Sequence, residues 1–364
     1  MWFPARNPRL RFITAAIAVT LAVVGCGQLF EDSPPEGLSM SHPQVQAVVA
    51  VQGRHTDDLL QSPGIVGTAT GLTRDGELAL LILFQSAPSD AVPERIDGVP
   101  VRAVVTGKIT ALHHRPGHGG GPGGGGGGDP PDTEPEPDPT EQWPRPVPIG
   151  ISTGSSHECS SGTIGARVLN AGGVFALSNN HVYATENSAP IGSDVLQPGS
   201  YDTGCAVTAG AVIGSLVDFE PIVFTTDANN QIDAAIASSS VDLLGKATPS
   251  DGYGAPLSLT ADAAVGISVQ KYGRTSSLTR GTITGINAIV NVGYGAGSAR
   301  FIGQIIVEST KPFIKAGDSG SLLVTDPGRA PVGLLFAGNR SGKFALANPI
   351  EAVLTRFGVS IDGE

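Results

Sequence analysis

The stretch Gly317-Asp-Ser-Gly-Ser has the residue types needed for nucleophilic catalysis. The hydroxyl of Ser319 becomes a competent nucleophile only when a base takes its proton and N–H groups receive the charge that develops on the substrate oxygen. Gly317 and Gly320 lack a Cβ, so the backbone around the serine can turn sharply and bring its amides close to a substrate carbonyl. Taken alone, the same stretch is equally typical of an ordinary turn.

A histidine and an aspartate in suitable settings precede this serine. His181 follows the apolar run 174–177, which predicts a buried strand that ends in a polar turn. Asp233 lies among small and apolar residues, and a buried carboxylate needs a hydrogen-bond partner such as a histidine N–H. Either residue alone is also typical of a surface or turn position. The chain order His181, Asp233, Ser319 is one in which Ser-His-Asp triads occur, so the three together predict a catalytic triad.

Three motifs make the C-terminal part similar to trypsin-like serine peptidases, most closely to bacterial enzymes of the α-lytic kind. They are Leu177-Ser-Asn-Asn-His-Val, Ile232-Asp-Ala-Ala-Ile and Gly317-Asp-Ser-Gly-Ser, and the segment Tyr272-Gly-Arg-Thr-Ser-Ser-Leu-Thr-Arg-Gly-Thr-Ile resembles a strand–turn–strand of the second barrel. The resemblance covers about residues 150–364 and extends to bacterial relatives of the plant narrow-leaf proteins.

The resemblance implies a mainly β fold, a chymotrypsin-like double β-barrel with a C-terminal helix. It implies a serine endopeptidase that cuts protein or peptide substrates through an acyl-enzyme. His181 would be the base, Asp233 would orient it, and the backbone amides of Gly317 and Ser319 would form the oxyanion hole. Neither a metal nor an organic cofactor is expected.

Some positions depart from the family's pattern. The two cysteines that join a hairpin in relatives fall on Gln270 and Arg280. The serine that supports the catalytic aspartate falls on Phe336, which implies the loss of one hydrogen bond to Asp233. The sequence contains no Ile-Val-Gly-Gly activation sequence, so we do not expect Asp318 to pair with a newly cut N-terminus.

The resemblance also places a substrate pocket a few residues before the nucleophile. Phe313 would form an apolar wall there, and Phe336 and Gly338 are the other expected substrate-binding residues. The stretch has no carboxylate to bind a substrate arginine or lysine, whereas Lys311 or Lys315 could attract acidic side chains. Preference for arginine or lysine is therefore not expected.

Two other functions stay open for the same sequence. The first is a catalytically silent β-barrel used for surface binding, which Phe336 favours. The second is an esterase or acyltransferase that uses the same triad. The net charge of −11, without a basic cluster, argues against a nucleic-acid partner.

The N-terminus predicts export. Three arginines precede an apolar stretch over 12–24 that is too short to be a confident membrane span, so residues 1–25 are expected to be an export signal. The end of this stretch, Val23-Val-Gly-Cys, resembles a lipobox, and a lipid on Cys26 would anchor the protein to a membrane of the cell envelope. The alternative is an ordinary secretory signal and a secreted protein.

Two cysteines remain, Cys159 and Cys205. In an oxidising compartment they are expected to form a disulfide that staples the first barrel around the His181 segment. The alternative is a pair of free thiols. A metal site is not expected, because no histidine cluster accompanies them.

The rest of the chain divides by composition. Residues 26–43 are expected to form a polar tether. Residues 44–112 are expected to form a small α+β domain, with a helix followed by strands over 65–72, 78–84, 99–105 and 108–112. Residues 113–148 are a glycine-rich, then proline-rich and acidic linker, and 149–364 are turn-punctuated β-structure with a closing helix. We expect the N-terminal domain to act on the rest in cis, as a pro-region or a cover. The alternative is a spacer or a separate binding module.

Overall fold

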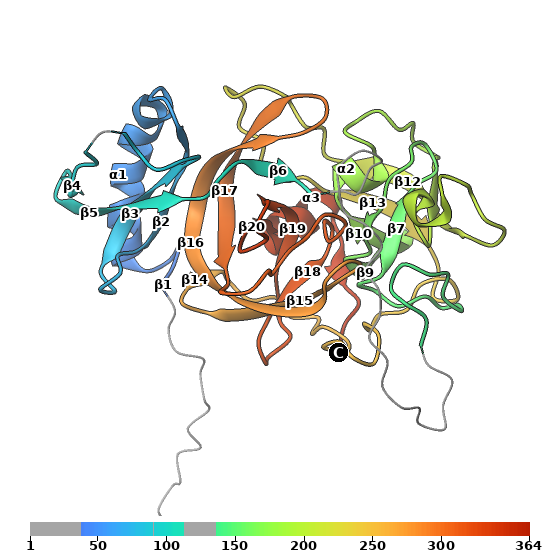
Figure 1. The fold of residues 1–364 in the computed structure, drawn as a ribbon. Coiled ribbons are helices and arrows are strands. Elements are labelled where there is room, and N and C mark those ends of the chain that lie inside the picture. The colour runs from blue at the N-terminus through green and yellow to red at the C-terminus, as the bar shows by residue number, and fades with distance from the viewer. Residues whose placement is uncertain (1–37, 90, 113–135) are drawn as a thin grey trace, which may run out of the picture. The chain divides into compact units, whose positions relative to one another are not determined.

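The computed structural model describes residues 38–89, 91–112 and 136–364, and these residues belong to one compact unit. The predicted export signal and Cys26 lie outside the described residues. Within the described part, no helix has both the length and the apolar character needed to cross a bilayer. The expected mainly β architecture with a C-terminal helix is confirmed (Figure 1).

Six strands of the C-terminal part form a closed barrel. Each pairs with the next, and the first also pairs with the last, in the order β15 (Ser268–Gly273), β18 (Leu322–Thr325), β19 (Pro331–Asn339), β20 (Phe344–Pro349), β17 (Ser298–Glu308) and β16 (Ser277–Gly293). Helix α3 (Ile350–Phe357) follows β20 directly and ends at Gly358, whose φ of 58° is the left-handed conformation that closes helices.

Strands that precede the barrel in the chain form an eight-stranded sheet together with the last strand, which follows the barrel. Its order is β21 (Ser360–Ile361), β9 (Ala166–Asn170), β10 (Gly173–Ser178), β13 (Ala235–Ser239), β12 (Val212–Phe219), β11 (Asp194–Leu196), β7 (Ser152–Ser155) and β8 (Gly162–Thr163). Two short helical turns interrupt it, α2 (Asn180–Tyr183) and a 3₁₀ turn over Ser200–Thr203. Its core holds Ile149, Ile164 and Leu216, all fully buried.

The N-terminal elements extend the barrel's sheet. Helix α1 (Pro43–Leu60) is followed by β2 (Ile65–Leu72), β3 (Leu78–Phe84), β4 (Arg95–Ile96), β5 (Val99–Val105) and β6 (Ile109–Ala111). The two-stranded pair β1 (Leu38–Ser39) and β14 (Ala264–Val265) lies outside that sheet. Strand β2 pairs antiparallel with the second half of β16, and β3 and β5 continue outward from it. We call residues 38–112 the N-terminal module.

This junction follows from the length of β16. Its first half pairs with β15 inside the barrel, whereas its second half extends past the barrel and would expose an open strand edge. Open edges favour aggregation, and β2 covers this one. Gly67 and Gly71 allow the close approach, because a Cβ on either would lie 2.5 Å from a carbonyl oxygen of β16.

Strand β3 explains how the module packs. Its sequence Leu-Ala-Leu-Leu-Ile-Leu-Phe is apolar on both faces, as expected for a strand covered on both sides. Leu81 and Leu83 pack into the cluster around Phe301, while Leu80 and Ile82 pack with Val48 of α1. The N-terminal module therefore shares its apolar core with the barrel.

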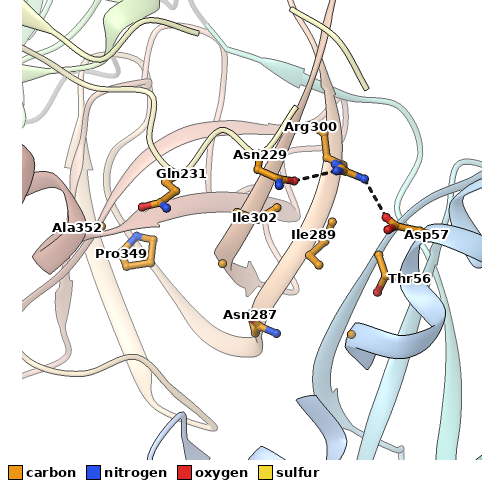
Figure 2. A pocket seen from close by; sticks show the side chains of 12 residues that line it. Thr56, Asp57, Asn229, Gln231, Asn287, Ile289, Arg300, Ile302, Pro349 and Ala352 are labelled. Atoms are coloured by element: carbon orange, nitrogen blue, oxygen red, sulfur yellow. Dashed lines mark hydrogen bonds and ion pairs between the residues drawn. The ribbon is translucent and has the colours of Figure 1, made fainter. Parts of the chain in front are cut away.

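Polar contacts at the same junction are specific. Gln52 of α1 is fully buried, its Nε2 donates to the carbonyl oxygen of Asn287 at 2.8 Å, and its Oε1 accepts from Thr70 at 2.9 Å. Nearby, Figure 2 shows Arg300 between Asp57 and Asn229, which it contacts at 3.0 and 2.8 Å, beside a cavity of about 490 Å³. The catalytic candidates do not line this cavity.

The predicted linker ends earlier than its composition suggests. The composition places residues 136–148 in the linker. In the structure, Trp143 and Val147 are buried in the core of the eight-stranded sheet, and Val147 pairs with Leu244. The apolar surface of these two side chains outweighs the proline-rich character of the segment around them. The rest of the linker, 113–135, lies outside the described residues.

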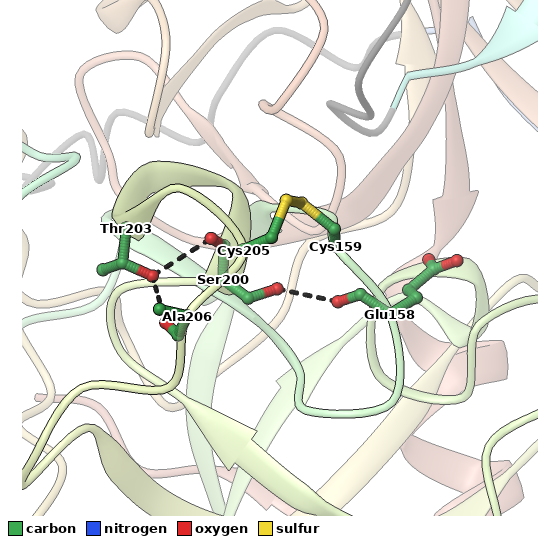
Figure 3. Close-up of a disulfide and its surroundings, with 6 residues drawn as sticks. All are labelled: Glu158, Cys159, Ser200, Thr203, Cys205 and Ala206. Carbon is green, nitrogen blue, oxygen red and sulfur yellow. Dashed lines mark hydrogen bonds between the residues drawn. A yellow bond between two sulfur atoms is a disulfide. The ribbon is translucent and has the colours of Figure 1, made fainter.

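A disulfide joins Cys159, ahead of β8, to Cys205, just after the 3₁₀ turn (Figure 3). The bond closes a stretch of chain with a sequence separation of 46, and Ser200 beside it donates to the carbonyl of Glu158 at 2.7 Å. This stretch includes His181, so the cross-link restrains the chain that carries the candidate base.

We predict that protein made in an oxidising compartment carries this bond. Peptide mapping by mass spectrometry without reduction should recover Cys159 and Cys205 in one linked peptide pair. Replacing both by serine should lower the free energy of unfolding by about 2–4 kcal/mol, since the bond restricts the unfolded chain. Recovery of two free thiols from the oxidising compartment contradicts the prediction.

Candidate active site

His181 and Asp233 are brought together at the ends of two paired strands of the eight-stranded sheet. His181 lies in the single turn α2, directly after β10, and Asp233 lies just before β13, which pairs with β10. The Nδ1 atom of His181 is 2.5 Å from Oδ2 of Asp233, and its backbone N–H donates to Oδ1 at 3.1 Å. Both side chains are fully buried. Because a carboxylate accepts hydrogen bonds, this contact assigns the proton to Nδ1 and leaves Nε2 able to accept another.

Ser319 lies where the two β-structures meet. Its carbonyl oxygen accepts from Thr163 N at 2.8 Å, and its Oγ donates to the carbonyl of Phe336 at 3.1 Å. A Cβ on Gly162 would lie 2.6 Å from Val182, the residue after His181, and 3.0 Å from Ser319 O. The chain segments that carry His181 and Ser319 therefore pack against each other through Gly162.

The turn around the serine depends on its glycines. Gly317 and Gly320 have φ values of 93° and 95°, in the left-handed region that favours glycine. A Cβ on Gly320 would lie closer to Ser178 Oγ and to the carbonyl oxygen of Thr163 than non-bonded atoms can approach. The glycines expected to permit a sharp turn are thus required by both conformation and space.

Asp318 fixes the same turn through its carboxylate. Its Oδ1 accepts from the backbone amides of Thr275 and Ser276 at 2.8 and 3.1 Å, and its Oδ2 accepts from Lys315 N at 2.8 Å. Lys271 Nζ lies 3.2 Å from Oδ2, and both side chains are fully buried. Burial lowers the pKa of Lys271, and the charge of Asp318 opposes that change. A lysine on β15 thus provides the positive charge beside Asp318.

Tyr294 corrects an expectation drawn from Phe336. The phenylalanine at the position of the family's supporting serine implied one hydrogen bond fewer to Asp233, but the hydroxyl of Tyr294 donates to Asp233 Oδ2 at 2.9 Å. Burial, and then the charge of Asp233, raise the pKa of Tyr294 well above its usual value, so the phenol stays protonated and remains a donor. The aspartate keeps a third donor from a different part of the chain.

The β16–β17 hairpin carries Tyr294 into the site. Tyr294 follows β16 directly, and its N–H donates to Gly297 O at 2.7 Å across the turn. The carboxylate of Glu186, which follows α2, accepts from the backbone amides of Gly295 and Ala296 at 3.1 and 2.7 Å. Glu186 therefore ties the hairpin tip to the His181 segment.

A segment of the chain itself lies against β19 beside Ser319. Strand β6 pairs antiparallel with β19, with Ala111 opposite Ala337 and Thr110 opposite Gly338. Leu112 N donates to Phe336 O at 3.3 Å, and Gly317 N donates to Leu112 O at 2.7 Å. The Gly317 amide, expected in an oxyanion hole, thus binds a peptide carbonyl.

The expected pocket residues divide into two groups. Gly338 and the backbone of Phe336 contact the bound segment, while the side chain of Phe336 packs 4.9 Å from the ring of Phe301, measured between centroids. Phe313 is fully buried in the cluster against which Leu112 packs. The positions of the family's hairpin disulfide, Gln270 and Arg280, lie directly opposite each other on β15 and β16.

The sequence patterns do not identify three further residues of this site. Tyr294 stands between glycines at a hairpin tip, and an aromatic residue there was a signal that could have marked it. Lys271 lies inside a buried strand between Gln270 and Tyr272, where a lysine needs a buried partner. Leu112 ends a predicted strand, but nothing in its local pattern indicates that the strand pairs with β19 beside Ser319.

Replacing Tyr294 by phenylalanine tests its part in the site. The change removes one hydrogen bond to a charged group, typically worth about 1.5–3 kcal/mol, so kcat on a peptide should fall roughly 10- to 100-fold with KM little changed. Tyr253→Phe is the matched control, in a tyrosine that packs against the cluster of Val353 and Leu354. Equal kcat for Tyr294→Phe and the wild type would show that Asp233 needs no such support.

Comparison with known proteins gives one negative and one positive finding. A scan against models of protein families finds no match. Solved structures that match include a glutamic-acid-specific serine protease, with a TM-score of 0.44 and 20% identity over 59% of this chain and 100% of that chain. Protease A of Thermobifida fusca matches with a TM-score of 0.44 and 20% identity over 60% and 100% of the two chains. An alpha-lytic protease homologue matches with a TM-score of 0.42 and 16% identity over 59% and 99%. Similarity of this degree establishes neither an activity nor a substrate for the present chain.

Proposed function

We propose that this protein is a serine endopeptidase that works through an acyl-enzyme. Ser319 attacks a peptide carbonyl, His181 takes its proton and later gives it to the leaving amine, and Asp233 holds the imidazole and stabilises its charged form. The backbone amide of Gly317, with that of Ser319, receives the charge on the carbonyl oxygen. The observation that carries the proposal is the 2.7 Å bond from Gly317 N to the carbonyl of Leu112, a peptide seated beside Ser319.

Two observations favour a peptidase over the other functions considered. Tyr294 supplies a hydrogen bond to Asp233. Phe336 is therefore no longer a reason to expect a catalytically silent barrel. The antiparallel pairing of β6 with β19 recognises backbone amides in an extended chain, a feature of peptide substrates that simple esters lack. The direct test is labelling with a fluorophosphonate probe, which reacts only with an activated serine, followed by identification of the modified residue. Ser319 is the expected site.

Export and anchoring belong to the same proposal. Support comes from the arginines and apolar stretch before Cys26 and from the lipobox-like Val23-Val-Gly-Cys. The mass of the mature N-terminal peptide separates a lipid-modified Cys26 from an ordinary signal cleavage and secretion. A disulfide between Cys159 and Cys205 is compatible with an oxidising compartment.

We propose further that the N-terminal module acts on the peptidase in cis. It covers the open edge of β16 and contributes Leu81 and Leu83 to the core around Phe301. Without it, that apolar surface and the strand edge would face water. The module is therefore expected to assist folding and to cover the β19 edge beside Ser319.

Residues 136–364 made alone, with the module added in trans, and in the full chain will test the cis role. We expect the lowest yield of folded protein from 136–364 alone and partial recovery when residues 38–112 are added. The variant Gln52→Leu in the added module removes the buried contacts with Thr70 and Asn287 and should weaken the recovery. Equal yield and activity in all arrangements would refute the cis role.

A further inference from the structure

The contacts of the segment 109–112 define how a peptide lies between β16 and β19. Ile109, Thr110 and Ala111 face Asn339, Gly338 and Ala337 of β19. Thr110 also pairs, in parallel, with Gly293 at the end of β16, so both edges of the segment are held. The chain runs from Ile109 toward Ser319. The carbonyl oxygen of Leu112, at the end of the segment, accepts a hydrogen bond from Gly317 N.

The position of Leu112 relative to Ser319 is set by one shared atom. The carbonyl oxygen of Phe336 accepts both from Leu112 N at 3.3 Å and from Ser319 Oγ at 3.1 Å. The serine hydroxyl and the Leu112 amide thus share one acceptor, while the Gly317 amide polarises the carbonyl of Leu112. A nucleophile beside a polarised carbonyl is the arrangement that acyl transfer needs.

The side chain of Leu112 fits an apolar pocket. It packs against the buried cluster that contains Phe313, Ile314 and Leu335. A Cβ on Gly338 would lie 2.9 Å from Leu112 Cδ1 and 2.9 Å from Ile314 Cγ2, so this glycine leaves the room that the leucine fills. Lys311 and Lys315, considered above as partners for acidic side chains, are exposed.

We propose that the enzyme cuts its own chain on the carboxyl side of Leu112, and that it prefers a leucine-sized apolar residue at this position in other substrates. The proposal rests on the peptidase function argued above. Ser319 Oγ bonds to the carbonyl carbon of Leu112, the C–N bond to the following residue breaks, and His181 passes the serine proton to the leaving amine. Water then hydrolyses the ester, which regenerates the serine and leaves Leu112 with a carboxylate.

Burial of a charge is what gives the pocket its selectivity. A lysine side chain at position 112 would place its ammonium among Phe313, Ile314 and Leu335, and burying an unpaired charge is costly. Methionine has nearly the same volume as leucine and no charge, so it should be accepted. Ile109 is itself 3% exposed in the core around Phe336, which anchors the segment independently of residue 112.

The first experiment measures self-cleavage in the full chain. Intact masses of the wild type over time should show a fragment that ends at Leu112 and a partner that begins at His113. The rate should not change on dilution by about 100-fold, because the reaction is intramolecular. Leu112→Met should cut at the same bond, Leu112→Lys should not, and Ser319→Ala should stay intact.

The second experiment measures preference on external peptides. In one preparation of the wild-type chain, Ile-Thr-Ala-Leu-p-nitroanilide should exceed Ile-Thr-Ala-Lys-p-nitroanilide in kcat/KM by on the order of 10²-fold. The ratio does not depend on how many sites are occupied by the chain's own segment, since both peptides compete with it equally.

The outcomes separate this inference from the function on which it rests. If the probe labels Ser319 but the chain stays whole or is cut at another bond, the inference falls and the peptidase function stands. Equal rates on the two peptides overturn the preference, and the fragment appearing in Ser319→Ala as well shows that another protease made it. If neither labelling nor any cleavage is seen, both proposals are wrong.

Discussion

Replacement of Ser319 by alanine is expected to abolish peptide hydrolysis and fluorophosphonate labelling while the fold is kept. The change removes one oxygen, whose hydrogen bond goes to the carbonyl of Phe336. Loss of a serine nucleophile from a triad typically lowers kcat by on the order of 10⁶-fold, because no other group forms the acyl-enzyme. The rates of hydrolysis of casein and of Ile-Thr-Ala-Leu-p-nitroanilide measure the loss of activity. The thermal unfolding midpoint measures whether the fold is kept.

Ser321→Ala is the matched control for this substitution. Ser321 lies in the same turn and is also fully buried, but its hydroxyl donates to Asp318 O at 2.6 Å and not to Phe336 O. It should keep labelling and most of the activity. Wild-type turnover by Ser319→Ala would remove the catalytic assignment of the serine, whatever the behaviour of the control.

The local patterns of the chain predicted much of this structure. The apolar run of β3 and the proline and glycine that bound α3 are signals that need no tertiary context. The three candidate catalytic residues were found in the same way, because each lies at an apolar-to-polar boundary. That their side chains act as a triad remains a proposal.

The remaining features depend on contacts between distant parts of the chain. Tyr294 reaches Asp233 only because β16 is long enough to carry the hairpin past the barrel to Glu186. The sequence shows a strand here but not where its tip lies. Likewise, residues 108–112 were predicted as a strand, but its two neighbours, β16 and β19, are set by the fold.

The predicted end of the linker, at residue 148, differs from the structure for a related reason. The acidic and proline-rich composition around Trp143 is typical of an extended tether, and composition averages over a window. The burial of Trp143 and Val147 depends on the apolar surface that the eight-stranded sheet offers them. The average composition of the segment hides a single tryptophan, and its burial becomes visible only in the packed structure.

Lys271 should be the most sensitive position outside the three candidate catalytic residues. Replacing it by methionine leaves the carboxylate of Asp318 buried without its positive partner, at a typical cost of about 3–5 kcal/mol in the free energy of unfolding. Asp318 lies between Gly317 and Ser319 and holds the amides of Thr275 and Lys315. Disturbance of that turn should displace the Gly317 amide and lower kcat by on the order of 10²-fold.

Urea unfolding and peptide turnover of three variants measure these effects. Lys343→Met, in an exposed lysine, should match the wild type. Lys271→Met should unfold at lower urea with an unchanged m-value, and Lys271→Met/Asp318→Asn should regain part of the loss, because the second change removes the unpaired charge. A Lys271→Met protein within about 1 kcal/mol of the wild type would mean that the backbone amides alone stabilise Asp318, and that the lysine is not needed to hold the turn.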